Sequence, residues 1–457
     1  MFHVQKNFLN IVKGSTPKQT KKRYDLANRS IYFNLRKLIN SMRDHNLRLF
    51  GMEADKGRWL FVLIGLLINI CLGSIYAFSV FRKPLEAMWD IPSSQSGYPF
   101  MVFLVVFAIV MPLAGNLMAS WGPQKTATLG GSLVGTGWIA ASFAPDITTL
   151  TLLYGVIGGA GVGMVYGCPI AVVAKWFPQK SGLAIGLTVM GFGISALITA
   201  PLMKAMISHP DIGTLNTFLY LGISFLVVVV LLAQGLRFPP IEWAHKDLTT
   251  SEKPTKKNSS FDLNRQEMLK TRSFYALWTT YTIGCLAGLM AIGIASPVGT
   301  EIAKLDATTA AFAVSLFAVF NGLGRPLFGT VADKLGPKYT AMISVTLILG
   351  ASLLLSELEE GNTSLYLIAF CTLWLCLGGW LALAPTSTGI FFGKHYYAQN
   401  YGIVYTAYGA GAILGTLISG NIKDITGSYL GAFPIVAGLA VLGLLIAGLG
   451  LSPVKPK

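Results

Sequence analysis

Arg325 is the residue whose type and surroundings point most directly to chemistry. It stands in NGLGRPLFGTVADKLG, residues 321–336, a stretch that is otherwise typical of a membrane-buried helix. A charged side chain near mid-membrane costs about 2.5–3.5 kcal/mol on insertion scales and normally faces a cavity or a partner. No Asp or Glu falls inside the expected spans, and Arg325 is their only charge away from the helix ends. We therefore predict that Arg325 binds a mobile anion, and the alternative is a structural link to backbone carbonyls.

The composition indicates which elements must position this side chain. Hydrophobic residues make up 53% of the 457-residue chain and charged residues only 12%. A helix needs about 20 apolar residues to cross a bilayer. Such stretches predict twelve spans, near residues 59–81, 98–118, 126–143, 148–174, 181–203, 216–236, 273–297, 308–330, 339–356, 363–392, 400–420 and 430–451. We expect an all-α integral membrane protein.

The positive charge of the chain is distributed by side of the membrane. With the N-terminus inside, nearly all Lys and Arg residues fall on the inner side. The outer side has five, namely Arg82, Lys83, Lys204, Lys304 and Lys423. This asymmetry predicts cytoplasmic termini and a cell (plasma or inner) membrane location. The net charge of +15 is then topological, with attraction to lipid headgroups, and not to nucleic acid, as its secondary consequence.

A basic tail, residues 1–57, precedes the first expected span. Residues 1–51 contain eleven Lys or Arg and two Asp, with no apolar core of the kind that a secretory signal needs. We expect a cytoplasmic tail, and the alternative is an organelle transit peptide. Met52 is a second candidate start.

One long polar break divides the expected spans six and six. This linker covers residues 237–272 and separates a bundle at 58–236 from a bundle at 273–452, with a short cytoplasmic C-terminus at 453–457. Parallel six-helix repeats that rock about a central site are one architecture of secondary transporters.

The two halves repeat each other locally. MPLAGNLMASWGP at 111–123 matches RPLFGTVADKLGP at 325–337, and Met111 stands where the second half has Arg325. The turn therefore packs without a cation in the first half. This argues against a purely structural need for arginine and favours anion binding.

Several motifs resemble a known family. GTVADKLGPK (329–338) resembles the loop signature of the major facilitator superfamily. NGLGRP (321–326), AKWFPQKSG (174–182), FFGK (391–394) and NYGIVYTAYGAGA (400–412) further resemble the oxalate/formate antiporter family, which is akin to the monocarboxylate transporters. The resemblance implies the major facilitator fold of two six-helix pseudo-repeats. It also implies a monomeric carrier without cofactor that exchanges or symports small carboxylates by alternating access.

The resemblance assigns roles to three polar residues. Arg325 corresponds to the arginine that binds the substrate carboxylate, for which a planar fork of two donors is suited. Asn321, one helical turn earlier, can face the same cavity. Tyr408 stands where oxalate transporters of the family carry a lysine. One cation beside a tyrosine hydroxyl suits lactate, pyruvate, formate or acetate, so we predict a monocarboxylate transporter, with oxalate/formate antiport as the alternative.

Four aromatic residues are further candidates for the wall of the site: Tyr76, Tyr166, Trp380 and Tyr405. Their side chains combine an apolar body with a hydroxyl or N–H donor. The family places aromatic residues from equivalent helices around its carboxylate, which these positions resemble. The alternative is that they pack between helices or lie in an interfacial belt.

Asp333 and Lys334 lie in the cytoplasmic turn after the eighth expected span. In the superfamily an aspartate at this place supports an inner gate, so we predict a gating role for the two residues. Charges solvated in a loop are the alternative.

Other patterns argue against different classes of protein. GGAGVG (158–163) lies inside an expected span with no strand before it, which favours close helix packing over dinucleotide binding. The cysteines form no CxxC pair and the histidines lie in tails or loops, so neither a metal site nor an enzyme is expected. No Asp, Glu or His is expected mid-span, which leaves both anion exchange and proton symport open. A transport-inactive substrate sensor is the remaining alternative.

Overall fold

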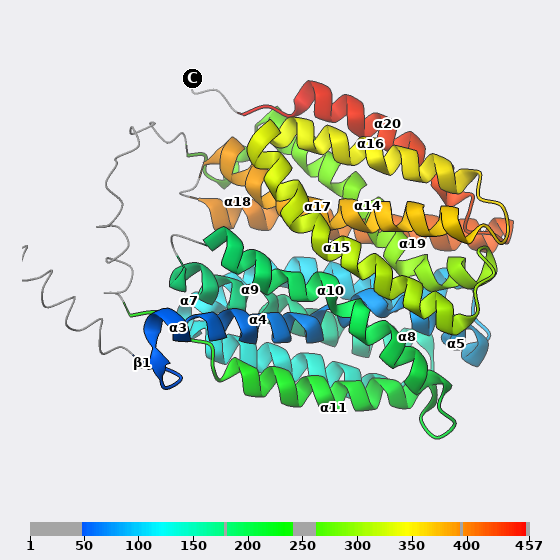
Figure 1. Ribbon diagram of the computed structural model, residues 1–457, viewed down its shortest axis with the longest axis horizontal. Coiled ribbons are helices and arrows are strands. Elements are labelled where there is room, and N and C mark those ends of the chain that lie inside the picture. The colour runs from blue at the N-terminus through cyan, green and yellow to red at the C-terminus, as the bar shows by residue number, and fades with distance from the viewer. Residues whose placement is uncertain (1–47, 178–180, 241–261, 394–395, 454–457) are drawn as a thin grey trace, which may run out of the picture. The chain divides into compact units, whose positions relative to one another are not determined.

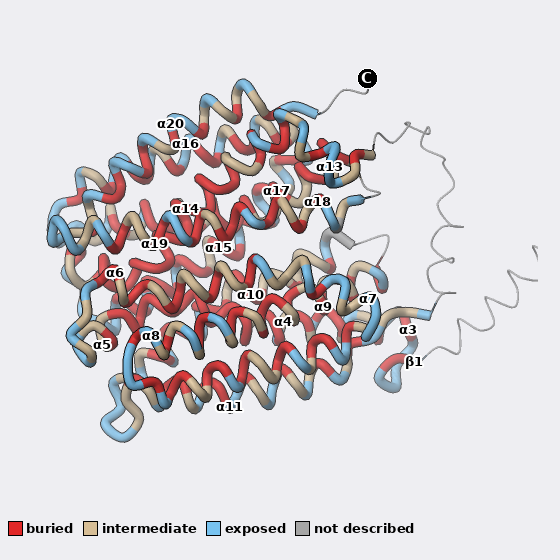
Figure 2. Tube along the Cα trace, turned by 180° about the vertical axis from the view of Figure 1, so that it is seen from behind, coloured by how far each residue is buried: buried red, intermediate tan, exposed pale blue. Residues whose placement is uncertain are grey.

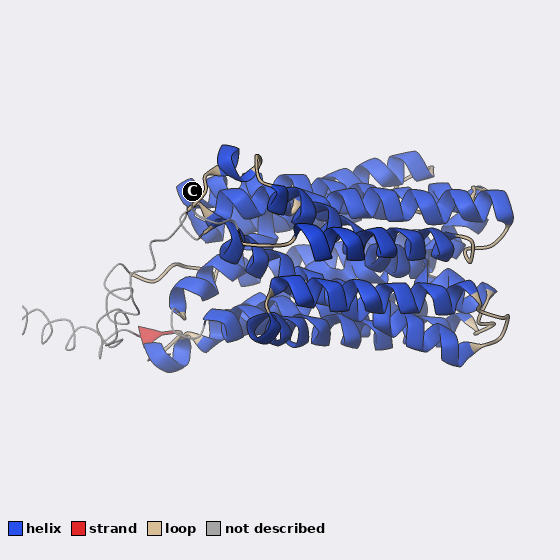
Figure 3. Ribbon diagram, turned by 90° about the horizontal axis from the view of Figure 1, so that it is seen from above, coloured by secondary structure: helices blue, strands red, loops and turns tan. Residues whose placement is uncertain are grey.

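The computed structural model describes residues 48–177, 181–240, 262–393 and 396–453 (Figure 1). Most of the expected N-terminal tail and much of the linker lie outside these residues. Nearly all of the described chain is helical, as Figure 3 shows. Its strands are β1 (Arg48–Leu49) and β2 (Met52–Glu53), which pair antiparallel. The expected all-α class is confirmed.

The chain divides into two units of unequal size. The smaller unit comprises residues 1–60 and 240–250, and its described part holds the two strands, α3 (Ala54–Gly57) and the first residues of α4. The larger unit comprises residues 61–239 and 251–457 and holds the rest of the helices. All candidate site residues belong to the larger unit.

The helices of the first half run from α4 to α11. They are α4 (Trp59–Leu72), the 3-10 helix η1 (Gly73–Ala77), α5 (Ser79–Trp89), α6 (Ser93–Ser96), α7 (Tyr98–Ala141), α8 (Ile147–Leu150), the π-helix η2 (Thr151–Gly158), α9 (Gly159–Trp176), α10 (Ser181–Ser208) and α11 (Gly213–Ala233).

The helices of the second half follow the linker, whose described end contains the short capped helix α13 (Arg265–Met268). The others are α14 (Arg272–Glu301), α15 (Ala307–Leu335), α16 (Pro337–Ser356), α17 (Thr363–Phe392), α18 (Tyr397–Val404), α19 (Thr406–Thr426) and α20 (Ala432–Gly450). Figure 1 shows α14–α20 gathered on one side of the larger unit and α4–α11 on the other.

Eleven helices of the described chain are long and apolar enough to cross a membrane, whereas the sequence predicts twelve. The difference arises in α7, which contains both the expected spans 98–118 and 126–143. Gly122 interrupts α7 with a non-helical backbone (φ 81°, ψ 167°). Gly336 has nearly the same conformation (φ 82°, ψ 160°), and there the chain separates into α15 and α16. A proline follows each glycine, so the repeated Gly-Pro motif makes the same turn in both halves.

Burial identifies which helices are central. The apolar part of α14 is entirely buried within the protein, whereas only a third of the corresponding part of α11 is buried. Figure 2 shows this contrast, with α14 mostly in the buried colour and α11 in a mixture of buried, intermediate and exposed colours. A helix that is apolar all round and exposed on its outer face is expected where lipid is the solvent.

Small residues let the helices that carry the candidate site approach closely. A Cβ added at Gly193 of α10 would lie 3.0 Å from Asn321 Oδ1 and 3.1 Å from Gly322 Cα, both of α15. A Cβ added at Gly378 of α17 would lie 2.0 Å from the carbonyl oxygen of Asn321. The backbone of α15 at Asn321 is thus held between α10 of the first half and α17 of the second half. Asn321 lies one helical turn before Arg325.

We expect Gly378→Ala to destabilise the protein, because its methyl group would overlap the Asn321 carbonyl unless α15 and α17 move apart. Overpacking of this kind costs about 1–3 kcal/mol. Thermal unfolding of purified protein in detergent measures the effect. Gly350→Ala on α16 is the matched control, since no atom lies within 4 Å of its added Cβ. Equal unfolding temperatures of the two variants would contradict this account of the packing.

Candidate functional site

Arg325 and Asn321 are buried one helical turn apart on α15. Arg325 is 6% exposed and Asn321 is fully buried. The equivalent residue of the first-half repeat, Met111, is partly exposed. Burial of a guanidinium in a helix of this apolar character is costly unless its donors are satisfied.

The guanidinium of Arg325 is satisfied on one side only. Its Nη1 donates a hydrogen bond of 2.5 Å to the carbonyl oxygen of Val189 on α10, in the other half. Its Nε and Nη2 are buried and have no hydrogen-bond partner in the described chain. In the planar fork these two N–H groups point the same way, and together they can bind both oxygens of one carboxylate. The expected alternative, a link to a backbone carbonyl, is therefore present but uses one donor group of the three.

Asn321 joins α15 to α17 and faces α10. Its Nδ2 donates to the carbonyl oxygen of Trp374 on α17 at 3.1 Å. Its Oδ1 is buried and has no hydrogen-bond partner among the described residues. An amide held in this way has an acceptor to offer to a hydroxyl group of a ligand.

Two tyrosines meet across the halves near these residues. The hydroxyl groups of Tyr76 in η1 and Tyr408 in α19 form a hydrogen bond of 3.0 Å. Trp374 connects this pair to the helix of Arg325, because its carbonyl oxygen accepts from Asn321 and its ring lies 6.2 Å from that of Tyr76. The ring of Tyr405 stacks on that of Tyr408, with centroids 5.2 Å apart and planes 14° apart. The structure therefore brings Tyr76, Tyr405 and Tyr408 together.

Tyr166 of α9 joins the same aromatic cluster through two phenylalanines. Phe107 of α7 lies 5.3 Å from the Tyr166 ring and 6.1 Å from the Tyr408 ring, centroid to centroid. Phe192 of α10 lies 5.4 Å from Tyr166 and 5.0 Å from Tyr76. The cluster and Arg325 come from six elements, of which η1, α7, α9 and α10 belong to the first half and α15 and α19 to the second.

Three members of this environment are absent from the sequence prediction: Phe107, Phe192 and Trp374. The Trp374 ring lies 6.2 Å from that of Tyr76, and its Nε1 is buried without a partner in the described chain. Phe107 and Phe192 are two of the 26 phenylalanines of the chain, and no pattern in the sequence distinguishes them. Trp374 lies six residues before Trp380 on the same helix, and the resemblance pointed to the latter.

Trp380 lies in a different packing environment. Its ring stacks on Tyr281 of α14, with centroids 5.8 Å apart, and its Nε1 is buried without a described partner. A Cβ added at Gly284 would meet this indole at 2.1 Å, so a glycine makes room for it. The ring contacts of the described chain thus connect Trp380 to α14 and not to Tyr76 or Tyr408.

Asp333 and Lys334 lie exposed in the last turn of α15, before Gly336. Neither side chain forms a hydrogen bond or an ion pair that the structure describes. Their gating role stays a prediction.

A bundle of apolar helices that are long enough to cross a membrane defines a multi-pass membrane protein. Its two halves meet around Arg325, whose guanidinium has two donors without a partner in the described chain. Its residues 59–300 and 286–457 match the model of the Major Facilitator Superfamily. The chain belongs to this superfamily, and it is a transporter of that superfamily and not an enzyme.

Individual relatives agree with the motifs. The chain is similar to the oxalate:formate antiporter of Oxalobacter formigenes, at 28% identity over 87% of this chain and 93% of the relative. It is also similar to monocarboxylate transporter 13 of Bos taurus, at 26% identity over 86% and 88%. Apicoplast pyruvate carrier 1 of Toxoplasma gondii is 24% identical over 76% and 81%. The predicted resemblance to the oxalate/formate antiporter and monocarboxylate transporter group is confirmed.

Proposed function

We propose that this protein is a secondary active transporter that carries small monocarboxylates across the membrane by alternating access. Arg325 binds the carboxylate, and Asn321, Tyr405 and Tyr408 orient the rest of the substrate. Lactate, pyruvate, formate and acetate are the substrate class. The names of the relatives, an oxalate:formate antiporter and monocarboxylate carriers, support a small carboxylate as cargo.

The observation that carries the proposal is the free edge of Arg325. A buried Nε and Nη2 without a partner among the described residues leave a cation with two parallel donors unused. In a low-dielectric interior such donors favour an anion strongly. A carboxylate has the two oxygens that this edge needs.

The charge balance of the site favours one carboxylate over two. The residues grouped around Tyr408 are aromatic: Tyr76, Tyr405 and Phe107. Arg325 can compensate one negative charge, and hydroxyl groups can only solvate a second. A dianion would therefore be bound with one charge uncompensated in a buried site, which is unfavourable.

The position of the site suits an alternating-access cycle. Arg325 belongs to the second half and donates to Val189 of the first, while Tyr76 of the first half bonds to Tyr408 of the second. Rocking of 58–236 against 273–452 must change both contacts. A substrate that replaces them would couple its binding to the movement of the halves.

Two alternative functions and two modes of coupling remain to be tested at this site. Oxalate/formate antiport requires a dianion to compete, and a transport-inactive sensor would bind without uptake. Exchange and proton symport differ in whether uptake makes the medium alkaline in de-energised cells. The proposed orientation has both termini in the cytoplasm, following the excess of Lys and Arg on that side.

Uptake of labelled L-lactate into proteoliposomes tests the proposal. Unlabelled pyruvate, formate and acetate are expected to compete, and oxalate is expected to compete at least about tenfold less well, which corresponds to about 1.4 kcal/mol. Strong competition by oxalate would favour the exchanger. Absence of uptake of every labelled monocarboxylate, by protein that is folded in detergent, would overturn the proposal.

A further inference from the structure

A second group of charged residues lies far from Arg325. We call the outer cluster the six side chains Arg82, Lys83, Glu86, Glu301, Lys423 and Asp424. Its location follows from α14, whose Ser273 Oγ donates to the carbonyl oxygen of Ser452 at 2.6 Å. This 30-residue helix begins at Arg272 and ends at Glu301, so the cluster lies at the end of the bundle opposite Ser452. In the orientation proposed above, this end faces the outside.

Glu301 is the centre of the ion pairs in the outer cluster. It pairs with Lys83 of α5, in the first half, and with Lys423 of α19, in the second half, the latter at 2.5 Å. Lys83 also pairs with Glu86 at 3.1 Å. The side chains of Glu301 and Lys423 are only 21% and 18% exposed, so solvent screens this pair less than a surface pair.

Lys83 stays charged in this position. Partial burial by itself lowers the pKa of Lys83, but its bonds to Glu301 and Glu86 outweigh burial and raise that pKa overall. The ion pair is therefore present throughout the neutral pH range.

Arg82 is a second buried cation, and it lies one residue beyond the expected span 59–81. Arg82 is 2% exposed, although the sequence places it among the outer-side charges. Its Nε donates to Ser96 Oγ at 2.9 Å, and its Nη2 donates to the carbonyl oxygen of Ser93. Both of these partners belong to the first half.

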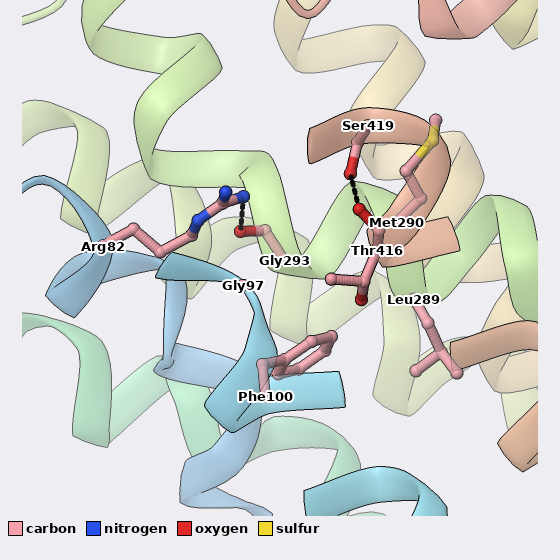
Figure 4. Close-up of a pocket in the computed structure, with 8 residues that line it drawn as sticks. All are labelled: Arg82, Gly97, Phe100, Leu289, Met290, Gly293, Thr416 and Ser419. Atoms are coloured by element: carbon pink, nitrogen blue, oxygen red, sulfur yellow. Dashed lines mark hydrogen bonds between the residues drawn. The ribbon is translucent and has the colours of Figure 1, made fainter. Parts of the chain in front are cut away.

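The third donor of Arg82 crosses to the second half. Nη1 donates to the carbonyl oxygen of Gly293 on α14 at 3.2 Å, as Figure 4 shows. The narrow cavity beside this bond has no room for a water molecule, and Thr416 and Ser419 of α19 line it from the second half. Arg82 thus lies in the contact between the two halves.

Another link between the halves lies next to these. The backbone N–H of Ser94, in the first half, donates to the carboxylate of Asp424 on α19, with distances of 3.2 and 3.4 Å to its two oxygens. A Cβ added at Gly420 would lie 2.6 Å from Ser94 Cα, so glycine permits this approach. Among the described residues, three hydrogen bonds or ion pairs therefore link the halves at this end: Lys83 to Glu301, Arg82 to Gly293, and Asp424 to Ser94.

We propose that the outer cluster is a latch that holds this end of the transporter closed, and that Glu301 is its central residue. Separation of the halves at this end must break all three crossing links together. It would leave Glu301 with Lys423 alone and would expose one donor of Arg82. The latch thus favours the closed arrangement until substrate or a movement at the other end favours opening.

The test measures opening directly. Ser419→Cys places a thiol at a position that is 1% exposed beside the Arg82 cavity. We expect Glu301→Gln to increase the rate at which a maleimide labels this thiol in permeabilised membranes by about tenfold or more, equivalent to about 1.4 kcal/mol. Lys83→Gln removes the crossing ion pair and the pair with Glu86 but keeps the bond of Glu301 to Lys423, so we expect it to increase the labelling rate by a smaller factor.

Controls separate latch opening from unfolding. Glu360→Gln breaks the pair of Lys304 and Glu360, which lies within the second half, and should leave the labelling rate unchanged. A thiol at the buried Ser344 should stay protected in every variant. The five native cysteines are buried, and each variant without Ser419→Cys measures their background. Labelling of Ser419→Cys that neither Glu301→Gln nor Lys83→Gln accelerates would overturn the latch.

This inference rests on the alternating access of the proposed function, but its test requires no substrate and no orientation. Failure of lactate uptake together with accelerated labelling would overturn the substrate and retain the latch. Lactate uptake that depends on Arg325, together with an unchanged labelling rate, would retain the proposed function and overturn the latch.

Discussion

Arg325→Gln is expected to reduce monocarboxylate uptake by more than an order of magnitude, about 30-fold or more in kcat/KM. Glutamine keeps a polar side chain but loses the charge and the paired Nε and Nη2 donors that face no described partner. Removal of one partner from a buried, hydrogen-bonded charge pair costs about 2–5 kcal/mol, so we expect kcat/KM for lactate to fall about 30-fold to 4,000-fold. Initial rates of labelled lactate uptake into proteoliposomes measure the loss.

Arg325→Lys separates charge from geometry. Lysine keeps the positive charge but presents a point charge in place of the planar fork, so we expect partial activity at best. Arg325→Met is a matched variant for folding, because the first-half repeat has Met111 at the equivalent position. Arg265→Gln, at an exposed arginine of α13, controls for loss of one positive charge. Uptake in Arg325→Gln equal to that in Arg265→Gln would contradict the role of Arg325.

The second large effect is a change of selectivity in Tyr408→Lys. Tyr408 is 1% exposed, and its hydroxyl group forms a hydrogen bond with that of Tyr76. A lysine there adds a second buried cation, which a monoanion leaves uncompensated and a dianion can neutralise. We expect oxalate to become a competitor at least about tenfold stronger relative to lactate, equivalent to about 1.4 kcal/mol. The competition panel for lactate uptake measures this ratio.

Tyr408→Phe is the control for that change, because it removes the hydroxyl without adding charge. Loss of one hydrogen bond costs about 0.5–1.5 kcal/mol, so lactate affinity should fall about 2-fold to 12-fold while oxalate stays a poor competitor. If Tyr408→Lys shows the selectivity of Tyr408→Phe, the number of cations in the site does not set the choice between one and two carboxylates.

Structural features that depend on hydrophobic periodicity and on rare residue types could be predicted from the sequence. Long apolar stretches predict the spanning helices, because backbone polar groups in lipid must be satisfied within helices. One arginine in such a stretch is conspicuous, and Arg325 is indeed buried. The Gly-Pro repeat likewise predicts equivalent turns, which Gly122 and Gly336 make.

Contacts between distant segments could not be predicted in the same way. Arg82 lies next to Lys83 near the end of an expected span, where charges normally reach water, so nothing local indicates its bond to Gly293. Phe192 and Trp374 are ordinary apolar residues until α10 and α17 bring them to Tyr76. One carbonyl, that of Val189, decides which edge of Arg325 is left free, and a backbone group has no signature in a sequence.

The most direct test of the central claim is binding of L-lactate to purified protein, measured as a rise in unfolding temperature. Ligand at about 100 times its Kd stabilises the folded state by about 2.7 kcal/mol. We predict a concentration-dependent rise for the unaltered protein and none for Arg325→Gln, with Arg265→Gln behaving like the unaltered protein. An equal rise in Arg325→Gln would contradict carboxylate binding by Arg325.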